Sequence, residues 1–150
     1  MKCAEITDTL IEAMESGKYG FIRVNFPNGD MVGHTGSMEA TIISMEALDI
    51  CIGRILETAD KLGTLVLFTA DHGNADECLE TNKKTGEVTN KPKTSHTLNP
   101  VPFIFYDKNF KDNYTVKEGS FGLSNIAATV VNLLGYKAPE KWDESMIEVK

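Results

Sequence analysis

The sequence predicts an α/β fold in which a single open, mostly parallel sheet is flanked by helices. Stretches with apolar residues every three or four positions alternate with short apolar runs of strand length. The chain has 150 residues, of which 41% are hydrophobic. A chain of this length can form one globular domain with a core of its own, so we expect a single domain.

The first two elements are a helix and a strand. Residues 4–15 place their apolar side chains on one face of a helix, and Gly17 is a typical residue for its C-terminal stop. Residues 19–26 (YGFIRVNF) are rich in aromatic and branched side chains and run into the turn sequence that starts at Pro27. This pattern predicts a strand that leads into a loop.

The next two elements are a long helix and a buried strand. From Ser37 to Gly63 the apolar residues recur at helical spacing, with Glu39 in the first turn and Lys61 in the last, as the helix dipole favours. Residues 64–70 (TLVLFTA) form a continuous apolar run, which is typical of a parallel strand covered on both faces. Strand, helix and strand together predict a right-handed crossover with functional loops at the carboxyl ends of the strands.

The rest of the chain is predicted to hold a polar excursion, a strand, a helix and a tail. Residues 79–95 are polar and favour a small hairpin around Thr85 and Gly86, without another periodic element. Residues 101–106 (VPFIFY) predict a strand, and residues 123–134 predict a helix that Gly135 stops. The tail, residues 136–150, is expected to be irregular and to pack over a sheet edge.

The charge balance excludes two classes of partner. Acidic residues outnumber basic ones by 22 to 15, and Lys and Arg are not concentrated in any one stretch. We therefore expect no nucleic-acid partner and no membrane partner. No apolar run approaches the ~20 residues that cross a bilayer, and the first five residues do not resemble a signal peptide. The three cysteines share no metal-type spacing. Together, these features favour a cytosolic protein with reduced thiols.

All three histidines of the chain, His34, His72 and His96, lie in loops beside predicted strand ends. Asp30 precedes His34 by four positions, so one turn of helix would aim both side chains at the same point. An ordinary glycine-rich turn would also explain residues 29–36 taken alone. Three histidines in three such places, however, favour a functional cluster over three unrelated loop residues.

A second acidic and imidazole pair directly follows the strand predicted at residues 64–70. Asp71 and His72 can face one ion only if the chain bends, and Gly73 would allow that bend. Taken alone, Asp71 could instead be a helix N-cap. His96 lies at the end of the polar excursion, just before the next predicted strand. A loop that leaves one strand end and brings a histidine back beside it is a common way to complete a ligand set.

The candidate ligands form one set of carboxylates and imidazoles without a thiolate: Asp30, His34, Asp71, His72 and His96. Such a set favours Mn²⁺ or Zn²⁺, with Mg²⁺ as the choice for a more oxygen-rich position. Five ligands suit two ions, and two-ion sites clamp transferring phosphoryl groups. The spacing leaves the reaction open, and no serine of the chain occupies an evident nucleophile turn. The lysines of residues 83–93 fit a solvated loop better than a phosphate site.

Three motifs resemble one known family. Residues 28–36 (NGDMVGHTG), 69–75 (TADHGNA) and 94–97 (TSHT), the last followed by PVP at residues 100–102, strongly resemble cofactor-independent phosphoglycerate mutases. That family, whose members do not depend on 2,3-bisphosphoglycerate, lies within the alkaline-phosphatase-like superfamily. The order and the intervals match, and the similarity extends through the helix ending at Gly135 and the segment KWDES, residues 141–145.

The resemblance implies an alkaline-phosphatase-like layered domain that holds two Mn²⁺ ions, with a second domain inserted into it that binds the substrate. It further implies that 3-phosphoglycerate and 2-phosphoglycerate interconvert through a phosphoserine, as a step of glycolysis. By carry-over, Asp30, His34 and His96 bind one ion, and Asp71 and His72 bind the other. The family completes the second ion with an aspartate and the nucleophilic serine, which have no counterpart in residues 1–150.

Members of that family are several-fold longer, so residues 1–150 are expected to be the C-terminal part of the metal-binding domain. The nucleophile segment and the inserted phosphotransferase domain are then absent, and the chain alone is expected to be inactive and to self-associate. Phosphoglycerate would be bound only in the complete enzyme. Two alternatives remain open: another phosphomutase or phosphatase of the same superfamily, and a non-catalytic metal-binding module.

Overall fold

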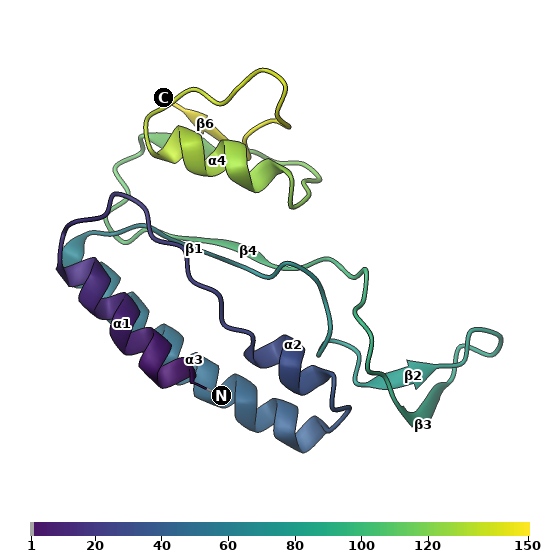
Figure 1. Cartoon of the computed structure of the whole chain (residues 1–150). Coiled ribbons are helices and arrows are strands. Elements are labelled where there is room, and N and C mark those ends of the chain that lie inside the picture. The colour runs from purple at the N-terminus through teal and green to yellow at the C-terminus, as the bar shows by residue number, and fades with distance from the viewer. Residues whose placement is uncertain (1) are drawn as a thin grey trace. The chain divides into compact units, whose positions relative to one another are not determined.

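A computed structural model describes residues 2–150 and divides the chain into two compact units. The first ends at Lys108, and the second comprises Asn109–Lys150. Figure 1 shows helices and strands in both units. Within the described residues, no helix is both long enough and apolar enough to cross a membrane.

Two helices form the core of the first unit. Helix α1, Cys3–Glu15, packs along α3, Met38–Leu62, and Figure 1 shows the two side by side. Leu10 of α1 and Ile55 and Ala59 of α3 are buried. Both helices were predicted from apolar spacing, and both are confirmed.

The ends of α3 also lie where the sequence predicts them. Ser37 is the N-cap, and its hydroxyl oxygen accepts a hydrogen bond from the backbone N–H of Ala40 at 3.3 Å. Gly63 is the C-cap and adopts a left-handed conformation with φ of 67°, which a residue with a side chain rarely takes.

The strand predicted at residues 19–26 does not form. This segment forms neither helix nor strand and pairs with no other strand within the described part of the chain. Tyr19 and Phe21 are more than half exposed. Aromatic and branched side chains favour an extended backbone, but a strand also needs a neighbour that takes its N–H and C=O groups. The predicted strand–helix–strand crossover is therefore wrong as well.

The two central strands pair in antiparallel orientation, which corrects the prediction of a parallel, fully buried strand. In strand β1, Val66–Thr69, the last residue faces the first residue of β4, Phe103–Tyr106. The chain leaves β1 and returns to β4 at the same end, so it must reverse direction. β1 is also only partly buried.

A hairpin follows β1, as predicted. Strand β2, Leu79–Thr81, pairs with β3, Val88–Pro92, and Gly86 takes a positive φ of 74° in the turn between them. The predicted single open sheet is wrong for the described residues, which form three two-stranded sheets with antiparallel pairing. The mixture of helices and strands agrees with the predicted α/β class.

The second unit holds helix α4, Asn125–Leu133, and the pair β5, Tyr114–Val116, and β6, Ile147–Val149. Helix α4 confirms the prediction for residues 123–134, and Gly135 follows it with φ of 82°. The tail is irregular only in part, because its end forms β6. The backbone N–H of Met146 donates to the buried hydroxyl of Thr129 at 2.9 Å, which ties this tail to α4.

Candidate metal centre

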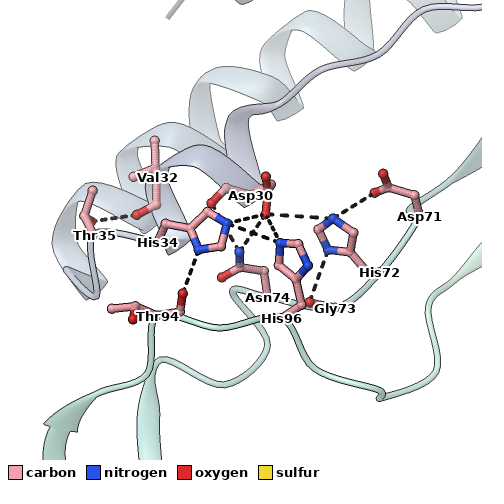
Figure 2. Close-up of polar contacts among 10 residues, drawn as sticks. All are labelled: Asp30, Val32, His34, Thr35, Asp71, His72, Gly73, Asn74, Thr94 and His96. Atoms are coloured by element: carbon pink, nitrogen blue, oxygen red, sulfur yellow. Dashed lines mark hydrogen bonds and ion pairs between the residues drawn. The ribbon is translucent and has the colours of Figure 1, made fainter.

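Three segments of the first unit bring the candidate ligands together at one end of the β1–β4 pair. Asp30 lies on α2, Asn28–Gly33, and His34 is the residue at which that short helix ends. His72 lies in the loop after β1, and His96 lies in the loop before β4. Figure 2 shows the three imidazole rings gathered around the Asp30 carboxylate. The helical turn expected between Asp30 and His34 is present.

Three donor atoms form a compact triangle. Asp30 Oδ1 lies 3.1 Å from His34 Nε2 and 2.9 Å from His96 Nε2, and the two nitrogens are 3.2 Å apart. Ligand atoms bound at about 2.1 Å to one ion, with about 90° between bonds, lie about 3.0 Å from each other. The triangle therefore has the size of one face of the shell around a single divalent ion, and the three side chains fit such an ion.

A contact of His34 determines which of its two ring nitrogens is available to a metal ion. His34 Nδ1 lies 2.7 Å from the backbone oxygen of Thr94. A carbonyl oxygen can only accept, so Nδ1 carries a proton, and Nε2 is the nitrogen that faces the triangle. The same contact ties α2 to the loop that carries His96.

His72 and Asp71 lie beside the triangle rather than in it. The His72 ring stacks on the His96 ring, with centroids 3.6 Å apart and planes inclined by 17°. His72 Nε2 is 3.6 Å from Asp71 Oδ1 and 3.9 Å from Asp30 Oδ1, and the Asp71 side chain is 81% exposed. All five side chains thus lie close together, but Asp71 sits at the open edge of the group (Figure 2).

The surroundings of Asp30 favour its charged form. Burial alone would raise the pKa of this carboxyl group, but hydrogen bonds from Asn74 and His96 and the charge of His34 outweigh burial. The pKa of Asp30 consequently lies below its usual value. The carboxylate is ionised at neutral pH, which is the state that binds a cation.

A close backbone approach joins the loops of His72 and His96. The N–H of Thr97 donates to the oxygen of Gly73 at 2.8 Å, and a Cβ atom at Gly73 would lie 2.1 Å from Thr97 Oγ1. Gly73 does not have a positive φ. The bend expected at Asp71 and His72 is present, and glycine is required at position 73 because the two loops touch.

Sequence reasoning missed the residues that support the ligands. Asp76 Oδ2 accepts hydrogen bonds from Thr97 Oγ1 at 2.8 Å and from Asn99 Nδ2 at 2.6 Å, next to the His96 loop. Asn74 contacts Asp30 directly. The one signal in the sequence was that Asn74 lies within the motif of residues 69–75 and that Asp76 directly follows it.

Carboxylates and imidazoles gathered at the end of a strand are typical of metal-binding sites in enzymes. Residues 1–138 match the metalloenzyme superfamily, and the chain belongs to it. The chain is similar to the 2,3-bisphosphoglycerate-independent phosphoglycerate mutase of Trypanosoma brucei brucei, with 44% identity over 99% of this chain and 28% of that protein. A probable enzyme of the same name from Leptospira interrogans is 46% identical over 99% of this chain and 28% of its own length.

A solved structure agrees with these relatives. The crystal structure of Leishmania mexicana phosphoglycerate mutase at low cobalt concentration superposes with a TM-score of 0.93 and 40% identity. The match covers all of this chain and 29% of that protein. The predicted resemblance and the predicted α/β class are confirmed, and the chain spans a little over a quarter of the length of the relatives it matches.

Proposed function

We propose that residues 1–150 are the C-terminal, metal-binding part of a phosphoglycerate mutase that interconverts 3-phosphoglycerate and 2-phosphoglycerate. The donor triangle of Asp30, His34 and His96 carries this proposal, because its size suits one ion and its residues fall in the motifs that resemble the mutase family. In the proposed parent protein, the nucleophilic serine and the inserted substrate-binding domain lie outside residues 1–150.

The five ligands have different tasks in this proposal. Asp30, His34 and His96 hold one ion, and Asp71 and His72 hold a second that needs further ligands from elsewhere in the parent. Bound divalent ions neutralise the charge of a transferring phosphoryl group and orient it. The exposure of the Asp71 side chain supports this role, because an exposed carboxylate can bind an ion whose other ligands come from another segment.

We assign Mn²⁺ to both positions, with Zn²⁺ and Mg²⁺ as alternatives. The ligand set of imidazoles and carboxylates without thiolate supports a borderline or hard divalent ion. The names of the relatives support a glycolytic role with phosphoglycerate as substrate, and we propose the cytosol as the location. Neither nucleic acid nor membrane is proposed as a partner.

A chimera tests the function directly. Residues 1–150 replace the matching segment of the Trypanosoma mutase, and conversion of 3-phosphoglycerate to 2-phosphoglycerate is measured with Mn²⁺ present. We expect turnover that is abolished by His34→Ala and by Asp71→Ala. Release of inorganic phosphate is measured in parallel. A folded, Mn²⁺-binding chimera that releases phosphate or does nothing, instead of isomerising the substrate, would refute the mutase assignment and favour one of the two alternatives.

A further inference from the structure

Asn74 contacts Asp30 through two hydrogen bonds from a single amide nitrogen. Its Nδ2 lies 2.8 Å from Asp30 Oδ1 and 3.2 Å from the backbone oxygen of the same residue (Figure 2). The side chain of Asn74 is nearly buried, with 6% exposure. The same carboxylate oxygen that faces His34 and His96 therefore also accepts a hydrogen bond from a buried donor.

The orientation of this amide follows from its partners. Both atoms of Asp30 that Asn74 contacts are acceptors, so only the NH₂ group can face them. Asn74 Oδ1 is buried and has no hydrogen-bond partner among the described residues. An unpaired buried oxygen is unfavourable. The contact with Asp30 is thus maintained although the other end of the amide is unsatisfied.

Gly33 leaves the space that this amide occupies. A Cβ atom at Gly33 would lie 2.4 Å from Asn74 Oδ1 and 2.9 Å from its Cγ, inside any normal contact distance. Gly33 and Asp30 both lie on α2. The amide of Asn74 therefore fits against the helix that carries Asp30, and any side chain at position 33 would push it away.

We propose that Asn74 is a positioning residue that holds the Asp30 carboxylate toward His34 and His96, so that the three donor atoms form a preassembled metal site. This inference rests on the metal site of the proposed function. Without Asn74, the carboxylate can rotate away from the two nitrogens. Loss of a hydrogen bond behind a ligand typically weakens metal binding by about 10- to 100-fold.

The test is a Co²⁺ titration of the 150-residue chain, followed by the visible absorption bands that report the geometry around the ion. We expect Asn74→Ala to weaken binding by about 10- to 100-fold and to alter the bands. Asn74→Leu keeps nearly the same shape but lacks the hydrogen-bond donor, so it should show the same loss of Co²⁺ affinity. It replaces the alanine variant if that variant does not fold. Circular dichroism and thermal unfolding show whether each variant is folded.

Asn28→Ala is the matched control. Asn28 is also a buried asparagine with an unpartnered Oδ1, but its Nδ2 donates to the backbone oxygen of Ser44 at 3.4 Å and not to Asp30. We expect this variant to lose stability while its Co²⁺ affinity and spectrum stay the same. Equal losses of affinity in Asn28→Ala and Asn74→Ala would mean that general loosening of α2 explains the effect, and would overturn the positioning role.

A double-mutant cycle provides a second test. Gly33→Ala should weaken Co²⁺ binding because it displaces Asn74, and Gly33→Ala combined with Asn74→Ala should bind no more weakly than Asn74→Ala alone. Additive losses would contradict the proposed route through Asn74. If the unchanged chain does not bind Co²⁺, the metal site itself is refuted. If the unchanged chain binds and Asn74→Ala binds equally well with the same spectrum, only the positioning role is refuted.

Discussion

Asp76 connects two of the loops that carry candidate ligands. It follows the His72 loop, and it accepts hydrogen bonds from Thr97 and Asn99 on the far side of His96. Burial alone would raise the pKa of Asp76, but the hydrogen bonds from Asn99 and Thr97 prevail and hold it below the usual value. A carboxylate with a lowered pKa is stabilised in the folded state in its charged form.

This lowered pKa predicts how stability depends on pH. The folded pKa of Asp76 lies below the unfolded value of about 3.9, so its contribution is complete above that pH and is lost as the pH falls through the folded pKa. Asp76→Asn should therefore be less stable than the unchanged chain at neutral pH, and the difference should shrink in acid. Urea unfolding over a pH series measures this. A difference that stays constant with pH would contradict the assigned charge.

At the scale of residues, the sequence indicates the candidate metal ligands better than it indicates the residues that hold them in place. Asp30, His34 and His96 could be selected because few residue types bind divalent ions and their spacing is distinctive. Asn74 could not be selected, because an asparagine after glycine in a loop usually indicates a turn. Its role depends on a contact with Asp30, which is 44 positions away.

At the scale of elements, the sequence predicted the longer helices correctly from local patterns but did not predict which strands pair. Helix α3 was predicted with both ends because its apolar spacing, N-cap and C-terminal glycine all lie within the segment itself. The pairing of β1 with β4, and the absence of a strand at residues 19–26, depend on which segment lies alongside. An apolar run of strand length does not carry that information.

Two glycines give opposite predictions for the same substitution. Gly53 lies within α3 and has open space where a Cβ would be, so Gly53→Ala should stabilise the chain by about 1 kcal/mol. Gly73→Ala should destabilise it, because the added atom would collide with Thr97 Oγ1. Thermal and urea unfolding measure both. A neutral Gly73→Ala variant would show that the two loops need not touch.

At the scale of the whole molecule, α3 exposes large apolar side chains that are usually buried in a folded protein. Ile43 and Ile50 are 66% and 68% exposed, and their spacing of seven places them on one face of the helix. Exposed apolar faces typically mark contact surfaces. Such a face is consistent with a chain that spans 28% of the length of its relatives.

We predict that the 150-residue chain self-associates. Its molecular mass, measured by light scattering over a concentration series, should rise with concentration, because association would bury the exposed face of α3. Replacing both Ile43 and Ile50 by lysine should lower the apparent mass. Glu46→Lys, on the same helix, is the control for the change in charge. A chain that remains monomeric at every concentration would contradict this prediction.

We also predict that the 150-residue chain does not convert 3-phosphoglycerate to 2-phosphoglycerate at any Mn²⁺ concentration. Transfer through a covalent intermediate needs an activated nucleophile, and a metal ion does not replace one. A coupled assay for 2-phosphoglycerate measures this, with the chimera described above as the positive control. Robust turnover by the purified chain would show that one of its own serines is the nucleophile.

The most direct test of the proposed metal centre is calorimetric titration of the chain with Mn²⁺. Three converging donors, Asp30, His34 and His96, should hold one ion appreciably, whereas Asp71 and His72 alone should hold a second only weakly. The account predicts one measurable site that is lost in His34→Ala and retained in Asp71→Ala. Two equally tight sites, or a site that survives His34→Ala, would contradict it.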